Sequence, residues 1–347
     1  MTLEPFQERI RDAAARGTAL RLRGGGTKDF YGNEPRGDVL DTRAYAGIVS
    51  YEPTELVITA RAGTGLSEIE TTLASQGQIL PFEPPHFGAA ATFGGCIAAG
   101  LSGPRRASAG ALRDFVLGAR IVDGRGRALA FGGQVMKNVA GYDVSRLLAG
   151  SLGTLGLIAE ASLKVLPRPP AERSLRLEMP QERALEAMQR WASQPLPISA
   201  TAWHDGELLV RLSGAAAAVA AAAGKIGGEP LEPAPWAAIR EHAHPFFAAA
   251  PLWRVAVPPV APPLALPGAQ LLEWGGALRW LAGPGPAAAV REAAQRAGGH
   301  ATLFRSREKI GGAFAPLAPA AMRLHRGLKA VFDPAGILNP GRMYAEL

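Results

Sequence analysis

The sequence contains a single cysteine, Cys96, among its 347 residues. One cysteine excludes a disulfide framework within the chain. It also excludes an iron–sulfur cluster held by this chain alone, since such a cluster needs about four thiolates. No stretch approaches the ~18 apolar residues, free of charge and proline, that a transmembrane helix requires. No block of about five or more like charges occurs, so a nucleic-acid-binding arm is not indicated.

Several nucleotide-binding and metal-binding motifs are also missing. The sequence has no GxxxxGK[ST], and it has no HExxH or clustered Cys/His pattern, so we expect neither a P-loop nucleotidase nor a metal site. Gly63-Thr64-Gly65 lies between an expected strand and helix, as in a dinucleotide fingerprint. However, Glu68 replaces its third glycine and no acidic residue follows about 20 positions on, so NAD is not expected. His242 and His244 would face different sides of a helix, and we expect solvated or capping roles for both.

The composition favours a soluble protein with many turns and an anionic partner. Hydrophobic residues make up 48% of the chain, and the 42 glycines and 29 prolines predict tight turns and long binding loops. The formal net charge of +7 suits a dinucleotide, a small carboxylate, nucleic acid or an anionic membrane surface. The first residues predict an amphipathic helix that ends at Gly17 rather than a signal peptide. We expect a cytoplasmic protein, with peripheral attachment to the inner face of the plasma membrane through a partner left open.

The order of predicted elements indicates an α+β protein with a junction at Arg168-Pro169-Pro170. Beyond the junction, strands and helices follow an order that suits an antiparallel sheet with helices on one face. A diverged β-α-β-β-α repeat is conceivable there, although no sequence repeat is clear. Before the junction we expect strands at 19–23, 38–42, 48–51, 56–61, 115–122, 127–131 and 155–165, and helices at 66–75, 94–101 and 143–148. After it we expect strands at 175–179, 198–213 (a hairpin), 252–258, 270–282 (a hairpin) and 300–305, and helices at 181–193, 215–223, 235–243, 286–297 and 319–332.

Three glycine-rich motifs carry the chemistry. Arg23-Gly24-Gly25-Gly26-Thr27 follows a strand, and its glycines would expose several N–H groups to a pyrophosphate, although a flexible turn is equally compatible. Residues 92–103 (TFGGCIAAGLSG) predict a helix of small residues whose N-terminus favours anions, or else tight helix packing. Residues 137–143 and 150–156 display backbone ahead of a strand, or form a loop with a helix cap. The long loop 81–93 is typical of a functional loop.

These motifs, in this order, resemble the FAD-binding domain of the vanillyl-alcohol oxidase / p-cresol methylhydroxylase superfamily over residues 19–167. The stretches RGGGTKDFYG, ATFGGCIAAGLSGPRR, KNVAGYDVSRLLAGSLGTLGLIAEASLKVLP and FDPAGILNPGRMY look most similar to the FAD-binding E subunits of bacterial glycolate oxidases (glycolate dehydrogenases). The resemblance implies a two-subdomain PCMH-type FAD-binding domain at 1–167, divided into about 1–52 and 53–167. An α+β cap domain with an antiparallel sheet would follow at 168–315, and a C-terminal helix and Asn-Pro-Gly loop at 316–347 would return to the first domain.

The resemblance also implies the cofactor contacts. Residues 24–27 would cradle the FAD pyrophosphate, and a second group would line the flavin and its phosphoribityl chain. Some relatives bind the flavin covalently through a histidine in the first glycine loop. GGGTKD has none, so non-covalent FAD is expected. The implied cofactor-binding residues are Arg23, Gly24, Gly25, Gly26, Thr27, Pro85, Thr92, Gly94, Gly95, Ser102, Gly103, Gly110 and Asp114 (near the adenine), Ile158 and Asn339.

The implied function is oxidation of glycolate, a 2-hydroxy acid, to glyoxylate, by hydride transfer to the flavin or by electron relay to a partner. The partners would be a second, larger flavoprotein subunit and an iron–sulfur subunit. The His-rich metal and substrate motif of larger glycolate and D-lactate dehydrogenases is absent, which leaves open whether this chain acts alone. Two other hypotheses are a stand-alone FAD-dependent dehydrogenase or oxidase of another hydroxy acid or polyol, and an assembly module with a vestigial flavin site. No catalytic residue is assigned; the basic candidates in the cap and tail are Arg254, Arg279, Arg305, Arg307 and His325.

Overall fold

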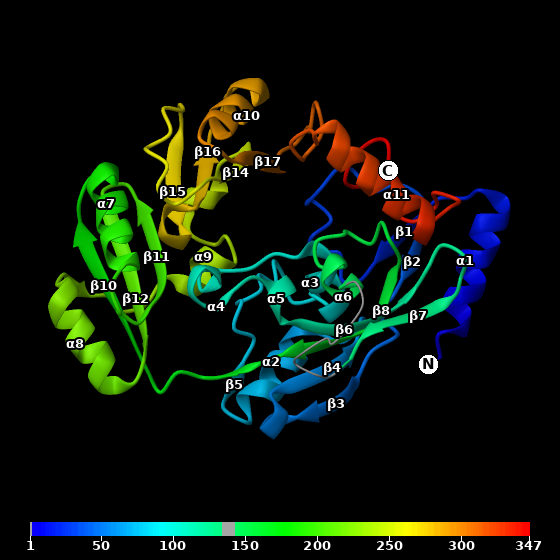
Figure 1. The fold of residues 1–347 in the computed structure, drawn as a ribbon, viewed down its shortest axis with the longest axis horizontal. Helices are drawn as coiled ribbons and strands as arrows, with labels where there is room; N and C mark the ends of the chain where they lie inside the picture. The colour runs from blue at the N-terminus through cyan, green and yellow to red at the C-terminus, as the bar shows by residue number, and fades with distance from the viewer. Residues whose placement is uncertain (1, 134–142) are drawn as a thin grey trace.

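The computed structural model describes residues 2–133 and 143–347. It has an N-terminal domain with one five-stranded and two two-stranded sheets, a cap domain built on one eight-stranded sheet, and a C-terminal helix that packs back on the N-terminal domain (Figure 1). The expected α+β fold class, with an antiparallel sheet in the cap, is confirmed. The motif at residues 137–143 lies outside the described residues, except for Asp143.

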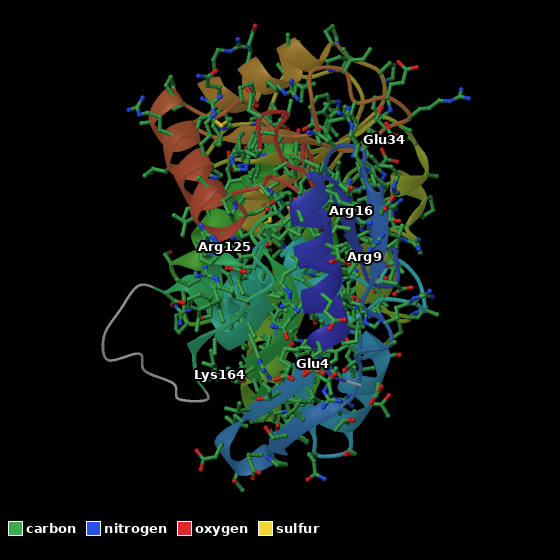
Figure 2. The ribbon with its side chains drawn as sticks, turned by 90° about the vertical axis from the view of Figure 1, so that its right-hand side faces the viewer. Glu4, Arg9, Arg16, Glu34, Arg125 and Lys164 are labelled. Atoms are coloured by element: carbon green, nitrogen blue, oxygen red, sulfur yellow. The ribbon has the colours of Figure 1, made fainter. Side chains whose placement is uncertain are left out.

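The chain begins with α1 (Glu4–Arg16), which covers a two-stranded parallel sheet of β1 (Leu20–Arg23) and β2 (Asp38–Asp41). Phe6, Ile10 and Ala13 are buried along one side of α1, three or four positions apart, as an amphipathic helix requires. Gly17 ends the helix with a left-handed φ of 65°. Figure 2 looks onto this helix, from which the charged residues Glu4, Arg9 and Arg16 project.

A five-stranded antiparallel sheet forms the centre of the N-terminal domain, in the order β3-β4-β8-β6-β7. Its strands are β3 (Ile48–Glu52), β4 (Val57–Arg61), β8 (Leu157–Lys164), β6 (Val116–Val122) and β7 (Ala128–Gly132), with the helices α2 (Leu66–Ala74), α3 (Phe93–Ala99), α4 (Arg106–Ala109), α5 (Leu112–Phe115) and α6 (Val144–Leu147) in the same domain. The sequence did not predict α4, α5 or the short pair β5 (Gln78–Ile79) and β9 (Leu166–Pro167). The expected subdomain boundary at residue 52 falls between β3 and β4. Because these two strands pair in one sheet, a boundary ahead of β3 fits the structure better.

The cap sheet has eight strands in the order β13-β10-β12-β11-β15-β16-β14-β17. Its halves repeat one plan, because each places its fourth, first, third and second strands side by side, and the halves join where β11 pairs with β15. The elements are β10 (Ala171–Glu178), α7 (Gln181–Ala192), β11 (Ile198–His204), β12 (Glu207–Gly214), α8 (Ala216–Ile226), β13 (Glu229–Pro230), α9 (Trp236–Arg240), β14 (Leu252–Ala256), β15 (Ala269–Glu273), β16 (Leu278–Ala282), α10 (Ala287–Arg296) and β17 (His300–Arg305). The repeat is therefore present in topology, although a proline-rich stretch at 257–268 replaces the first helix of the second half.

The two faces of the cap sheet have different neighbours. Leu208, Val210 and Leu272 pack with α7 and α8 on one face, and α10 covers the same face of the second half. The alternate residues, such as Leu271 and Trp280, pack on the opposite face with Tyr31, Leu101 and Leu152 of the N-terminal domain. Because this second face meets the N-terminal domain, we call it the inner face of the cap sheet.

A buried charge cluster fixes the cap against the N-terminal domain. Glu83 receives hydrogen bonds from Arg105 (backbone N, 2.9 Å) and from Arg211 of the cap (2.9 Å), and Arg105 also pairs with Glu172 of the cap at 2.8 Å. Burial alone would raise the pKa of Glu83, but Arg211 and Arg105 hold it below its ordinary value. Because Glu83 of the N-terminal domain and Glu172 of the cap share Arg105 and Arg211, the cluster joins charged groups of both domains and helps to set their relation.

The C-terminal helix α11 (Pro319–Phe332) docks through a buried ion pair. Lys329 Nζ lies 2.8 Å from Asp333 and donates to the carbonyl of Thr154 in the N-terminal domain at 2.9 Å. At the end of the helix, Arg125 donates to the carbonyl of Val331 at 2.9 Å (Figure 2). The tail after α11 is thereby returned to the N-terminal domain.

Candidate cofactor site and cap face

The bend after β1 presents an unpaired row of amides. The backbone N–H groups of Gly25, Gly26, Thr27 and Lys28 donate no hydrogen bond to any residue in the described part of the chain, whereas the N–H of Asp29 donates to Gly26 O at 3.1 Å. Successive free amides in a bend form a concave anion-binding nest. The bend therefore suits a diphosphate.

The glycines in this bend also have a packing role that sequence reasoning missed. A Cβ on Gly25 would lie 1.5 Å from the carbonyl oxygen of Ala90, and one on Gly24 would lie 2.3 Å from Oγ1 of Thr92. Gly26 has a left-handed φ of 72°. The glycines thus let the loop 81–93 lie directly against the bend, so that two of the sequence motifs meet.

The charges beside the bend are largely neutralised within the chain. Arg23 Nε lies 2.9 Å from Asp29, which also pairs with Arg21. Lys28 donates to the carbonyl of His86 at 3.1 Å, and burial lowers the pKa of its ammonium. Anion binding at the bend therefore depends more on backbone N–H groups than on free cationic side chains.

The N-terminus of α3 differs from expectation. Phe93 N donates to Thr64 O at 2.8 Å and Gly94 N to Ala62 O at 2.8 Å, while Gly95 N bonds the capping hydroxyl of Thr92 at 3.3 Å. These amides are already used by the protein, so the prediction that this helix end offers N–H groups to an anion is wrong. The small residues of α3 serve packing and surface instead, because a Cβ on Gly94 would lie 2.5 Å from that of Ala62.

Two adjoining cavities, of about 90 and 60 Å³, lie between the bend, α3 and the loop before β8. These volumes suit a phosphate-sized part of a ligand, and a whole dinucleotide would extend beyond them. Ten predicted cofactor residues line one or both: Arg23, Gly24, Gly25, Gly26, Thr27, Thr92, Gly94, Gly95, Ile158 and Asn339. The structure therefore brings most of the predicted cofactor-binding residues together around these two cavities.

Five predicted residues lie away from these cavities. Ser102 accepts the N–H of Leu112 at 3.0 Å, and Gly103 accepts the Trp274 indole N–H at 3.0 Å. Asp114 accepts the N–H of Ala111 at 2.9 Å beside Gly110, whose φ is 111°. Pro85 is buried in the loop 81–93. The structure thus gives Ser102, Gly103 and Asp114 contacts within the protein.

The cavities are also lined by residues that the cofactor prediction did not name. The lining includes Leu22, Thr42, Ala62, Lys28, Asp29, Pro35, Ala98, Ala99, Leu152, Gly153, Gly156, Leu157 and Arg342. The glycine run 150–156 did point to Gly153 and Gly156. Arg342, which follows the Asn-Pro-Gly turn, gave no sequence signal, and its position depends on the return of the chain after α11.

Asn339 holds this return in place. It has a left-handed φ of 43°, its Oδ1 accepts Leu22 N at 2.8 Å, and its Nδ2 donates to Leu152 O at 2.6 Å. The guanidinium of Arg342 donates to the carbonyl of Asp29 at 3.0 Å, and burial lowers the pKa of Arg342 to about 10. The tail therefore closes one side of the cavities and ties the bend to the loop before β8.

The inner face of the cap carries a cluster of aromatic rings around few polar groups. Trp280, Phe304, Phe247, Phe30 and Phe87 contact one another or His242 with centroids 3.9–6.2 Å apart. Glu273 is 4% exposed and accepts the Trp280 indole N–H at 2.7 Å. Burial raises the pKa of Glu273 to about 7. The face is thus a water-poor surface with a titratable carboxyl.

His242 differs from the solvated role expected for it. Its ring stacks on Phe247 at 3.9 Å with an interplanar angle of 2°, and its Nδ1 is buried without a hydrogen-bond partner among the described residues. Burial lowers its pKa to about 3, so the ring is neutral. His244 does cap the turn that follows it, since its Nδ1 accepts Phe246 N at 3.3 Å. The sequence missed the turn between them, which brings His242 inside.

The basic residues of the cap and tail that the sequence suggested as candidates have different surroundings in the structure. Arg279 is buried and donates to the carbonyls of Gly276, Pro262 and Ala261, so it is structural. His325 hydrogen-bonds the Ala321 carbonyl of its own helix, at 2.9 Å. Arg305 lies 4.8 Å from the centroid of Phe30. Arg254 projects from the inner face of the sheet, where Glu273 and Trp280 also lie.

Membrane-spanning helices and metal-binding clusters are both missing from the described residues. No helix there is long and apolar enough to cross a bilayer. Within residues 2–133 and 143–347, no three His, Cys, Asp or Glu side chains gather closely enough to hold a metal ion.

Comparison with known proteins defines the class. The family model of an FAD binding domain matches residues 2–132, and that of the C-terminal domain of FAD linked oxidases matches residues 307–343. Two solved structures of alkyldihydroxyacetonephosphate synthase share the fold, with TM-scores of 0.65 and 0.68, at 18% and 17% identity over 97% of this chain and 74% of theirs. The protein is therefore a flavoprotein of the FAD-linked oxidase class, and FAD is its cofactor.

Sequence relatives narrow the assignment. The glycolate oxidase subunit GlcE of Escherichia coli (strain K12) is 50% identical over 98% of this chain and 97% of that protein. The glycolate oxidase subunit GlcD of Bacillus subtilis (strain 168) is 34% identical over 44% of this chain and 33% of that protein. A D-lactate dehydrogenase of Archaeoglobus fulgidus is 34% identical over 51% of this chain and 40% of that protein. The chain belongs to the family of the glycolate oxidase subunit GlcE.

Proposed function

We propose that this chain is the FAD-binding subunit of a glycolate-oxidising enzyme that converts glycolate to glyoxylate. The observation that carries the proposal is the row of free amides at residues 25–28, set against the small-residue wall of α3, in a chain whose full length matches GlcE. The amides would bind the diphosphate, and Ala98 and Ala99 leave room beside it. The first glycine loop, GGGTKD, has no histidine for covalent attachment, so the flavin would be held non-covalently.

In the reaction, the α-carbon of glycolate loses a hydride equivalent and its hydroxyl loses a proton. Bound FAD supplies the acceptor for the two electrons. The residues of this chain would hold the dinucleotide through the bend, exclude water with the aromatic inner face of the cap, and orient the carboxylate by positive charge. If the chain instead relays electrons, the same cofactor contacts apply and the substrate contacts belong to a partner.

The partners would be a larger flavoprotein subunit and an iron–sulfur subunit. The name of the Escherichia coli relative supports a multi-subunit assembly, because GlcE is one subunit of a glycolate oxidase. Any iron–sulfur cluster of the assembly would have to lie in another chain, since the one cysteine here, Cys96, is buried and burial raises its pKa to about 12. The assembly would lie in the cytoplasm, with any membrane contact made by partners.

An absorbance spectrum of the purified full chain tests the proposal. We expect a flavin spectrum, a yellow supernatant after acid precipitation, and co-purification of two further subunits. Flavin in the pellet would refute non-covalent binding, and a colourless chain that cannot be loaded with FAD would refute the function. Anaerobic bleaching by glycolate in the chain alone would show intrinsic catalysis. Bleaching only by another hydroxy acid or a polyol would favour the stand-alone alternative.

A further inference from the structure

Two arginines from different domains contact one indole ring at the seam between the N-terminal domain and the cap. The guanidinium carbon of Arg106, in α4, lies 4.4 Å from the ring centroid of Trp274, and that of Arg254, in β14, lies 5.2 Å from the same centroid. The ring is fixed because its N–H donates to the carbonyl of Gly103 at 3.0 Å. Two positive charges therefore converge on one rigid platform.

Neither guanidinium has a protein acceptor. Throughout residues 2–133 and 143–347, Arg106 and Arg254 donate no side-chain hydrogen bond and pair with no carboxylate, although both are half-buried. The adjacent Arg105 is different, since it pairs with both Glu83 and Glu172. Burial, and then the charge of Arg254, lowers the pKa of Arg106. Like charges held near each other in reduced water are costly, and a bound anion would relieve that cost.

The surroundings suit a small, planar anion. Tyr31, from the N-terminal domain, is 8% exposed, and its hydroxyl makes no hydrogen bond to a described residue. The other titratable groups that respond to Arg254 are Glu273, His242 and His300. The aromatic cluster of the inner face adjoins this position. A short chain with one charged end would meet positive charge at one side and apolar rings at the other.

We propose that Arg106 and Arg254 together bind the carboxylate of the 2-hydroxy acid substrate, with Trp274 as the platform that positions both guanidinium groups. This assignment rests on the proposed function and adds the residues that recognise the substrate. Because one arginine comes from each domain, the site is complete only when the cap is packed on the N-terminal domain. Planar guanidinium groups match carboxylate geometry, which lysine does not.

Calorimetric titration of the full-length, FAD-loaded chain with oxalate tests the assignment without requiring turnover. Oxalate is a two-carbon carboxylate that carries no oxidisable C–H bond. We expect Arg106→Met and Arg254→Met each to weaken oxalate binding about tenfold or more, and Arg→Lys at either position to weaken it less. Arg113→Met is the matched control, because Arg113 is exposed, lies near Arg106 and contributes charge without contacting Trp274. Its affinity should stay within about twofold of wild type.

The outcomes separate this inference from the proposed function. Unchanged oxalate binding in both methionine variants, or no oxalate binding to the wild-type chain, would overturn the anion site. An equal loss in Arg113→Met would also overturn it, because only general charge would then matter. If oxalate binds as expected but glycolate never reduces the flavin, even with partner subunits, the anion site stands and the glycolate assignment fails. If Arg254→Met, folded by circular dichroism, reduces its flavin with glycolate at the wild-type KM, the function stands and the site fails.

Discussion

Replacement of Gly25 by alanine should remove most FAD affinity while leaving the fold intact. The added Cβ would lie 1.5 Å from Ala90 O and 2.4 Å from the carbonyl carbon of the same residue. Both atoms are backbone, so no side-chain rotation relieves the clash. Ordinary contact begins at 3.4 Å, and the bend and the loop 81–93 must therefore separate by about 2 Å.

The magnitude follows from the amides that this displacement moves. A shift of about 2 Å takes a hydrogen bond of ~2.9 Å out of bonding range. Each hydrogen bond to a charged phosphate contributes ~1.5–3 kcal/mol, so losing two of the four amides at 25–28 costs ~3–6 kcal/mol. The dissociation constant for FAD should therefore rise by about 10²–10⁴-fold.

The assay is titration of the deflavinated full chain with FAD, followed by quenching of flavin fluorescence. Gly77→Ala is the control, since Gly77 has a left-handed φ of 64°, has nothing within 4 Å of its missing Cβ, and lies away from the bend. It should cost ~1–2 kcal/mol of stability by backbone strain and leave FAD affinity unchanged. Wild-type affinity in a folded Gly25→Ala chain would refute the assignment of the bend as the diphosphate site.

Three further substitutions test the charges that the fold buries. Burial raises the pKa of Glu273 from 4.5 to about 7, so the stability that its protonated form contributes is lost as pH rises from about 4.5 to 7. Glu273→Gln should therefore raise stability at pH 8 by up to ~3 kcal/mol and flatten the pH dependence of urea unfolding, and an unchanged profile would contradict this. Lys329→Met should lower the free energy of unfolding by ~3–5 kcal/mol because Asp333 stays buried and unpaired, and the added Asp333→Asn change should restore part of it. Glu83→Gln should cost ~3 kcal/mol in urea unfolding, because Arg105 and Arg211 lose the carboxylate they share and keep only the more exposed Glu172; a loss below ~1 kcal/mol would show that the cluster does not hold the cap.

Local sequence signals were sufficient to predict most of the elements, whereas the cofactor followed from the resemblance to a known family. Alternation and turn residues predicted most strands and helices after residue 168, including the hairpin of β11 and β12, because these signals are local. The ordered glycine motifs carried the resemblance that implied the FAD-binding fold, and positions that need a bend or close approach accept few other residues. The helix cap of Asp143 was likewise predicted, since its side chain bonds the backbone three residues on.

The contacts of the site residues depend on how segments far apart in the chain pack against one another. Whether an N–H is free for a ligand depends on distant acceptors: Ala62 and Thr64 use the amides of α3, while the bend at 25–28 has no such neighbour among the described residues. The buried ring of His242 and the approach of Arg106 to Arg254 likewise join positions far apart in the chain. Local periodicity carries no information about such partners, because they meet only when the domains pack.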